Sequence, residues 1–307
     1  MSITQIIELA GTALELGLIT SLTVLALFLS YSMLNICDLS TDGCFTLGAA
    51  VGAVVALSGH PYLSIFAAMG AGMLSGFITA FLQTKMGVDS LLAGIIVNTG
   101  LYSLNIAVMS GKSLLNLNKA ETIFTKFSTL LEGTPLVKQS KLIVIIFAVA
   151  LVVLFLTLFL RTRLGLAIRA TGDNTTMVKS SSINPVFTII IGLVIANAFT
   201  GLAGCLNAQY LKSVNIDIGT GIVTIALASL LIGGAFMGKG GIFSRAVGVV
   251  IGSFLFRLVY TIALRFNMPA FMLKLVSSVI VVIAISGPYL KSRFPELKKR
   301  FNVGRGR

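Results

Sequence analysis

Two short polar stretches, 38–43 and 216–221, interrupt an otherwise apolar chain, and each leads into an apolar run. They supply acids and hydroxyls that could bind a solute: Asp38, Ser40, Thr41, Asp42, Asp217 and Thr220. Polar and glycine residues directly before a short apolar run are typical of a broken membrane helix. The free backbone N–H groups and the positive dipole end of such a break suit a carboxylate or another polar group. The acids Asp42 and Asp217 themselves are better interpreted as simple N-caps, so the expected chemistry is solute binding by the broken backbone.

Arg257 lies near the middle of an apolar segment. A charge at that depth costs at least about 2.5–3.5 kcal/mol unless it faces protein or water. The guanidinium could bind a substrate carboxylate, pair with one of the acids above, or snorkel to the headgroups. Asn98 is a second polar side chain at membrane depth, where amides more often bond a neighbouring helix than a ligand. Both residues are candidates for a translocation path.

The residue types and spacings in the sequence indicate neither a catalytic site nor a metal site. The cysteines Cys37, Cys44 and Cys205 have no Cys-x-x-Cys spacing, and the single histidine, His60, precedes a proline. The stretch 233–239 matches a phosphate loop up to its lysine, but a glycine then replaces the hydroxyl that would hold Mg²⁺. We therefore expect no metal site, no bound cofactor and no ATP hydrolysis in this chain.

The elements that must position these residues are membrane helices. The 307 residues are 56% hydrophobic and only 11% charged, with mean hydropathy +1.00, whereas soluble domains are about 25% charged. Nine apolar segments have roughly the length that a bilayer requires. They lie near 14–36, 44–58, 62–84, 90–109, 141–160, 186–208, 218–237, 244–266 and 270–290. The predicted fold class is all-α, a polytopic membrane protein with about nine transmembrane segments.

A weak internal repeat relates two parts of the chain, about 14–111 and about 186–290, with 141–160 as a linking span. Gly72-x-x-x-Gly76 in the first part corresponds to Gly248-x-x-x-Gly252 in the second. Corresponding spans are five apart, an odd number, so the two repeats would be inverted. Inverted repeats with broken helices indicate a transport pathway at the repeat interface. Chance similarity between helices rich in glycine and alanine is the alternative.

The stretch 161–184, RTRLGLAIRATGDNTTMVKSSSIN, reads as a structured basic loop. Its apolar residues predict one face of a short helix that stops at Gly172, and Asp173 or Asn174 could cap a second helix through 175–181. Such a loop suggests a docking surface for a soluble partner, and a merely solvated loop is the alternative. The residues expected to dock are Arg163, Leu166, Arg169, Gly172, Asp173, Asn174 and Lys179.

Lysine and arginine set the expected orientation. More of them fall on the side of the 161–184 loop and the basic tail 291–307 than on the other side, although the loop 110–140 is itself basic. The positive-inside rule then places the loop and the C-terminus in the cytoplasm and the N-terminus outside. The net charge of +13 is thereby explained without nucleic acid.

Four stretches together resemble bacterial ABC-importer inner-membrane permeases of the branched-chain amino acid and ribose type. They are the 161–184 loop, DLSTDGCFTLGAAV (38–51), LLAGIIVNTGLYSLNIAVMSG (91–111) and FRLVYTIALRFNMPAFMLKL (256–275). The resemblance is closest to a subgroup described as uncharacterised or tryptophan/tyrosine-type permeases. Ser182 departs from the pattern, since a glycine commonly stands there.

The resemblance implies a single permease domain over 1–307, in the bacterial plasma membrane, that forms half of an importer for a small solute, an amino acid in this subgroup. Its implied partners are a second permease chain, expected as a homodimer, a cytoplasmic ATPase and an extracytoplasmic substrate-binding protein or lipoprotein. The chain also meets membrane lipid. ATP and Mg²⁺ would belong to the ATPase, and the loop 161–184 would couple it to the path.

Two other classes remain as alternatives. An ion- or proton-coupled secondary transporter would use the Asp and Arg groups, but would leave the basic loop without a role. An integral-membrane enzyme would need a catalytic constellation that the sequence lacks.

Overall fold

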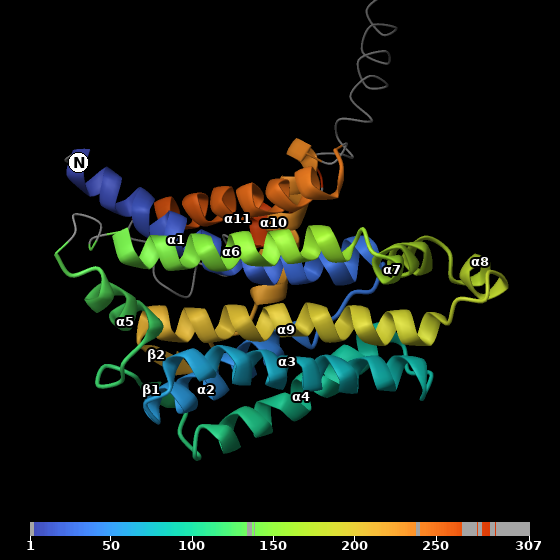
Figure 1. Cartoon of the computed structure of the whole chain (residues 1–307), viewed down its shortest axis with the longest axis horizontal. Coiled ribbons are helices and arrows are strands. Elements are labelled where there is room, and N and C mark those ends of the chain that lie inside the picture. Colours follow the sequence, from blue (N-terminus) through green and yellow to red (C-terminus); the bar gives the residue numbers. More distant parts are fainter. Residues whose placement is uncertain are drawn as a thin grey trace, which may run out of the picture.

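The computed structural model describes residues 3–133, 137, 139–237, 240–265, 275, 278–282 and 286, and these are mostly helical (Figure 1). The helices are α1 (Ile3–Leu27), the π-helical turn η1 (Phe28–Met33), α2 (Thr41–Leu57), α3 (Pro61–Thr84), α4 (Ser90–Val108), α5 (Ile123–Leu130), α6 (Ser140–Phe159), α7 (Arg163–Asp173), α8 (Thr175–Ser180), α9 (Pro185–Leu211), α10 (Ile222–Met237) and α11 (Ile242–Arg265). Two three-residue strands, β1 (Leu114–Asn116) and β2 (Ser213–Asn215), complete the described part.

Within the part of the chain that the structure describes, six helices are long and apolar enough to cross a membrane, which agrees with a polytopic membrane protein. They are α1 with η1, α3, α4, α6, α9 and α11. Two of the remaining three predicted segments form the shorter apolar helices α2 and α10. Three parts of the sequence lie wholly or mostly outside the described residues. They are the predicted segment 270–290, the tail 291–307 and the end of the stretch 256–275. The count of nine spans therefore stays a prediction.

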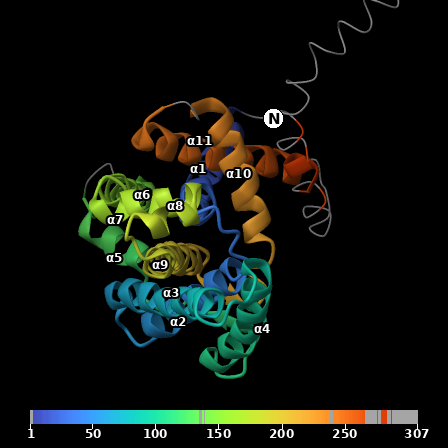
Figure 2. The same cartoon turned by 90° about the vertical axis from the view of Figure 1, so that its right-hand side faces the viewer.

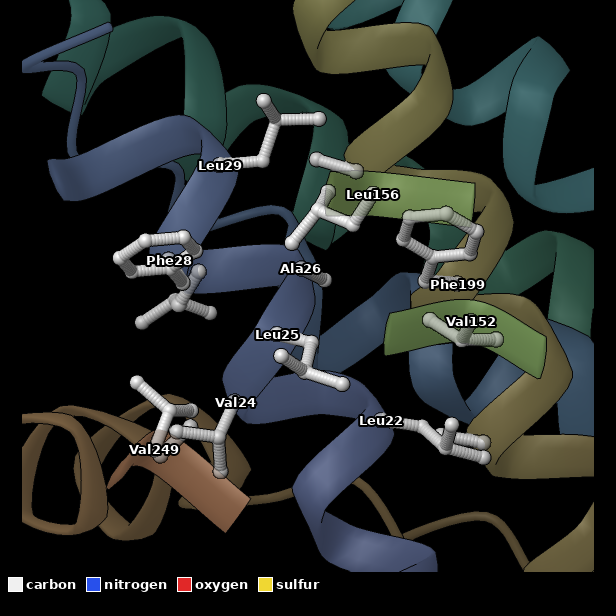
Figure 3. Packing of buried hydrophobic residues seen from close by; sticks show 14 of the residues in the cluster. Leu22, Val24, Leu25, Ala26, Phe28, Leu29, Val152, Leu156, Phe199 and Val249 are labelled. Atoms are coloured by element: carbon white, nitrogen blue, oxygen red, sulfur yellow. The ribbon is translucent and has the colours of Figure 1, made fainter. Parts of the chain in front are cut away.

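Helix α1 lies at the centre of the main core, because its residues are apolar on nearly every side. It packs against α11, α9 and α6. Figure 3 shows Val24 beside Val249 of α11, and Ala26 toward Leu156 of α6 and Phe199 of α9. Burial on several faces explains why α1 reads as one long apolar run rather than as an amphipathic helix.

Small residues allow the closest helix contacts, as expected in membranes. A Cβ atom on Gly72 of α3 would collide with the carbonyl of Asn197 in α9, and one on Gly48 of α2 would collide with Gly201 of α9. In the proposed second repeat, Gly252 of α11 instead packs on α10 at Ser229. The two Gly-x-x-x-Gly pairs therefore contact different elements, and the inverted repeat is not established by them.

The two ends of the helix bundle carry different structures (Figure 1). At one end, β1 pairs antiparallel with β2, with Leu115 opposite Val214, and α5 lies beside them. At the other end stand α7 and α8, between α6 and α9. Sequence reasoning left 110–140 as a loop, although Thr122 and Thr125 form a capping box that begins α5.

Helix α10 differs in direction from its neighbours. Figure 2 views α3, α6 and α9 nearly along their axes, whereas α10 is seen from the side, running from the region of α2 and α4 to α11. It packs mainly on α11 and α1, and its first residues reach α2. This path places the turn 216–221 against the start of α2.

Candidate functional site

A polar cavity of about 380 Å³ lies between α2, α4 and the turn before α10. The polar side chains that line it include Asp42, Asn98, Thr99, Tyr102, Ser103 and Thr220. The structure thus brings three of the predicted path residues, Asp42, Asn98 and Thr220, to one cavity. The amides, hydroxyls and single carboxylate can bind a polar solute by hydrogen bonds.

Asp42 joins the two predicted breaks directly. Its carboxylate accepts hydrogen bonds from the backbone N–H of Gly221 at 2.9 Å and of Val223 at 2.8 Å, at the start of α10. Thr46 Oγ1 accepts a further one from the N–H of Gly219 at 3.2 Å. Asp42 is therefore a helix cap, but it caps α10 rather than its own helix, which corrects the sequence interpretation.

Asp217 has a different role from its predicted counterpart. It is exposed in the turn, and α10 begins only at Ile222, so Asp217 is not an N-cap. Its carbonyl oxygen accepts the N–H of Thr220 at 3.0 Å and the hydroxyl of the same residue at 2.8 Å. These bonds fold the turn that presents Thr220 to the cavity.

Asp38, Ser40 and Thr41 form a closed network under α2. Asp38 is only 3% exposed, and its carboxylate accepts hydrogen bonds from the N–H and hydroxyl of Ser40 and, at 2.7 Å, from the amide of Asn197 in α9. Thr41 donates to the Asp38 carbonyl, and Thr79 of α3 donates to Ser40. A buried carboxylate held by three donors positions the backbone break and does not line the polar cavity.

Contacts between α2 and α4 explain two further residues of the cavity. Asn105 donates to the carbonyl of Gly43 at 3.2 Å, and a Cβ on Gly43 would lie 2.6 Å from the side-chain oxygen of Asn98. Sequence reasoning missed Tyr102 and Ser103. Their spacing from Asn98 and Thr99 repeats every three to four residues, which is the signal for one helix face.

Arg257 lies elsewhere, between α11 and α1. Its guanidinium sits 5.0 Å from the centroid of the Tyr260 ring, and its side chain faces Gly17 of α1. The neighbouring Tyr210 donates to Glu15 at 2.7 Å. Arg257 does not line the polar cavity, so the structure does not bring it together with the acids that were its predicted partners.

The predicted docking loop consists of two short helices, each with its own cap. Thr162 accepts from the N–H of Gly165 at the start of α7, and Asn174 accepts from the N–H groups of Thr176 and Met177 at the start of α8, each at 3.0 Å. The predicted choice between Asp173 and Asn174 is thereby resolved in favour of Asn174.

Helix α7 rests on the end of the first span. A Cβ on Gly172 would collide with the carbonyl of Met33 and with Leu34. Gly172 lies inside α7 and its φ angle is not positive, so it is not the predicted helix stop; close packing is what requires a glycine there. Ile168 is fully buried, and the hydroxyl groups of Thr171 and Thr188 lie 2.9 Å apart, which ties α7 to α9.

The opposite side of α7 and α8 faces outward. Leu166 and Met177 are 53% and 54% exposed. Arg163, Asp173 and Lys179 are also exposed, and Arg169 is half-buried. We call this face, formed by Arg163, Leu166, Asp173, Met177 and Lys179, the loop surface. Apolar side chains ringed by charges on a helical surface are suited to contact another protein.

Ser182, which departs from the resembling pattern, has a φ of 59°. This left-handed conformation favours glycine and explains why a glycine is common at this turn. The N–H of Ser182 still bonds the carbonyl of Lys179, and Asn184 caps α9, accepting the N–H of Val186. The turn into α9 is therefore kept despite the serine.

The chain matches the model of a protein family, the permease component of branched-chain amino acid transport systems, over residues 9–285. It is 31% identical over 267 residues to the tyrosine transport system permease protein of Clostridioides difficile, covering 87% of this chain and 86% of that protein. It is also 33% identical to the D-allose transport system permease protein of Escherichia coli K12, over 70% of this chain and 65% of that one. The ribose import permease protein of the same strain is 27% identical over 71% and 67%. No solved structure matches the chain significantly.

Proposed function

Because the chain belongs to the family of permease components of branched-chain amino acid transport systems, we propose that it forms half of the membrane pathway of an ATP-driven importer. The solute would be an amino acid, with tyrosine or a related aromatic as the first candidate, as the name of the Clostridioides difficile tyrosine permease suggests. The chain itself is a multi-pass membrane protein. It would move solute without catalysing a reaction.

A path made of packing contacts and a short stretch of chain, from α7 to the polar cavity, carries this proposal. Gly172 of α7 touches Met33 and Leu34, at the end of the first span. The chain then leads within a few residues to Asp38, which is bonded to Asn197, and on to Asp42, which holds the start of α10. A displacement of α7 would therefore be transmitted to both broken helices, as a coupling loop requires.

The loop surface would receive the ATPase. Its exposed leucine and methionine supply apolar contact, and its charged residues fit a polar rim. An ATPase works in the cytoplasm, so this end of the bundle would be cytoplasmic, which agrees with the excess of lysine and arginine. The end with β1, β2 and α5 would then meet the substrate-binding protein.

The polar cavity would form part of the path, completed by a second copy of the chain. Thr99, Tyr102 and Ser103 are exposed on α4 at membrane depth. Polar side chains in a span usually face protein or water rather than lipid. A second permease chain against this face of α4 would cover them and enclose the solute.

The packing scheme also supports two related halves. Helix α1 packs on α11 as α9 packs on α3, and the short helices α2 and α10 meet at their N-termini through Asp42. This exchange of partners fits inverted repeats, in which α1 corresponds to α9 and α3 to α11. The path would then run at the interface of the halves.

The test is reconstitution of the chain with its ATPase and binding protein in proteoliposomes, with radiolabelled tyrosine as the probe. Leu166→Glu places a charge in the loop surface and should reduce ATP-driven uptake at least tenfold, together with co-purification of the ATPase. Leu114→Glu changes an exposed leucine at the other end of the bundle and should leave ATPase binding intact.

Equal ATPase binding by both variants would remove the docking role of the loop surface. Uptake that follows a proton gradient and survives ATP depletion would instead identify a secondary transporter. A wild-type complex that transports other solutes but not tyrosine would retain the importer and refute only the substrate.

A further inference from the structure

A second cavity, of about 670 Å³, is an apolar groove between α3, α5, α6 and α9. It lies on the opposite side of α9 from α4, the helix that lines the polar cavity. Figure 1 shows α6 and α3 on either side of α9, with α5 at one end. Its walls include Phe66 and Phe147, which are 70% and 69% exposed. No described residue of this chain fills the groove, so another molecule must cover these rings in the membrane.

The length of the groove matches one leaflet of a bilayer. Along α6 its lining runs from Ile143 to Phe155, a rise of about 18 Å at 1.5 Å per residue. This is close to half of the roughly 30 Å hydrocarbon thickness of a membrane. At the inner end, Phe155 meets Phe199 of α9 edge-on, with ring centroids 5.8 Å apart. The groove therefore starts at the α5 end of the bundle and ends where these two rings meet.

Positive charge stands at the open end. Lys126 of α5 lies 5.9 Å above the ring of Tyr62, which lines the groove, and 3.2 Å from Glu121. Lys141, at the start of α6 and two residues before the groove lining, lies over the ring of Tyr210 at 5.4 Å. Lys126, which also pairs with Glu121, and Lys141 thus place two ammonium groups above an apolar groove one leaflet long. We call these two lysines the cationic rim, and they complement a molecule with an anionic head and an acyl tail.

We propose that the groove binds an anionic phospholipid of the leaflet at the α5 end. One acyl chain lies between α3 and α6, and the phosphate lies beside Lys126 and Lys141. A transmembrane helix of another protein would also be apolar, but it would pass the closed inner end, and the cationic rim would have no counterpart on it. The lipid would stabilise α6 against α9 and hold α5 at the membrane surface.

Native mass spectrometry of the purified chain in mild detergent tests the lipid directly. Phosphatidylglycerol is added in competition with zwitterionic phosphatidylethanolamine of the same acyl chains. The wild-type protein should retain one tightly bound phosphatidylglycerol in preference to phosphatidylethanolamine. Equal retention of both lipids, or of neither, would overturn the proposal without any variant having to fold.

Matched variants then locate the site. Ala148→Phe fills the groove, whereas Ala150→Phe adds the same ring at an exposed position of α6 outside it. Only Ala148→Phe should lose the bound lipid. Equal lipid binding by the two variants would place the lipid elsewhere and overturn the assignment.

A second pair of variants tests the contact with the lipid headgroup. Replacing both Lys126 and Lys141 by Gln should lower the preference for phosphatidylglycerol, by roughly fivefold for each lysine near the surface. The control replaces the exposed Lys112 and Lys119 by Gln and keeps the preference. If the control pair loses as much as the rim pair, general surface charge rather than this rim selects the lipid, and the proposal fails.

Discussion

At the scale of single residues, one buried and one half-buried acid hold the backbone in this protein. Asp38 and Asp42 stand four residues apart and both are saturated by donors from other elements: Asn197 for one, and Gly221 and Val223 for the other. Charge-assisted bonds of this kind are stronger than bonds between neutral groups, and they weigh more where water is excluded. The two broken helices are therefore fixed to each other rather than left as flexible ends.

Asp42→Ala should lower the free energy of unfolding by about 1–2 kcal/mol, since it removes the cap of α10. Asp42→Asn keeps one acceptor oxygen and should therefore cost less than Asp42→Ala. Equilibrium unfolding in mixed micelles measures both. Asp217→Ala is the control, because its carboxylate is exposed, and should stay within about 0.5 kcal/mol of the wild type.

Equal losses for Asp42→Ala and Asp217→Ala would contradict the capping geometry. The pair is informative because the sequence alone does not distinguish the two acids. Both acids precede an apolar run in the sequence, and aspartate is a good N-cap residue at either position. The bond from Asp42 to Val223 spans 181 positions along the chain, and no local pattern encodes a contact of that separation.

At the scale of elements, the sequence predicts a helix where the length and hydropathy of a segment determine it. It predicts a helix cap where the capping residue and the N–H groups that it binds are close along the chain. Asn174 and the second helix of the loop are of this kind. Helix α5 was missed because eight residues with mixed polarity resemble a loop. At Gly172 the sequence predicts a stop where the structure has close packing. Glycine at a helix end has two physical reasons, a left-handed turn or close packing, and only the neighbouring element tells them apart.

Gly172→Ala tests that packing. The added Cβ would press on Met33 and Leu34, and overpacking of this kind costs about 1–3 kcal/mol. Gly70→Ala is the matched control, since Gly70 also lies within a helix and has open space around its Cβ position. It should be neutral or stabilising by about 0.5–1 kcal/mol.

Thermal unfolding in detergent measures both glycine variants, and coupled ATPase activity in proteoliposomes shows whether the contact also transmits motion. A Gly172→Ala protein as stable as Gly70→Ala would mean that α7 is not seated on the first span. A stable variant with lost coupling would separate transmission from folding.

At the scale of the whole molecule, the described faces of the bundle differ in the kind of molecule that each is suited to contact. The α7–α8 end has exposed apolar and charged residues, the α3–α6 side has a groove for an acyl chain, and α4 carries polar groups at membrane depth. The sequence indicated the first, because polar loops stand out from apolar spans. It could not indicate the groove, because exposed phenylalanines on a span look the same whether they face bulk lipid, a bound lipid or a protein.

The polar face of α4 leads to the last prediction, since it argues for a second copy of the chain. Ser103 lines the polar cavity and is exposed in the single chain. If two copies meet at α4, cysteines at position 103 lie near the two-fold axis and face each other. Membranes containing Ser103→Cys should therefore give a covalent dimer with a short bis-maleimide. The test uses a Cys37→Ser background, because Cys37 is only half-buried, whereas Cys44 and Cys205 are buried. Leu154→Cys, on an exposed face of α6, should remain monomeric, as should the background protein. Equal yields from positions 103 and 154 would place the contact elsewhere. The cavity would then need another partner to shield Thr99, Tyr102 and Ser103 from lipid.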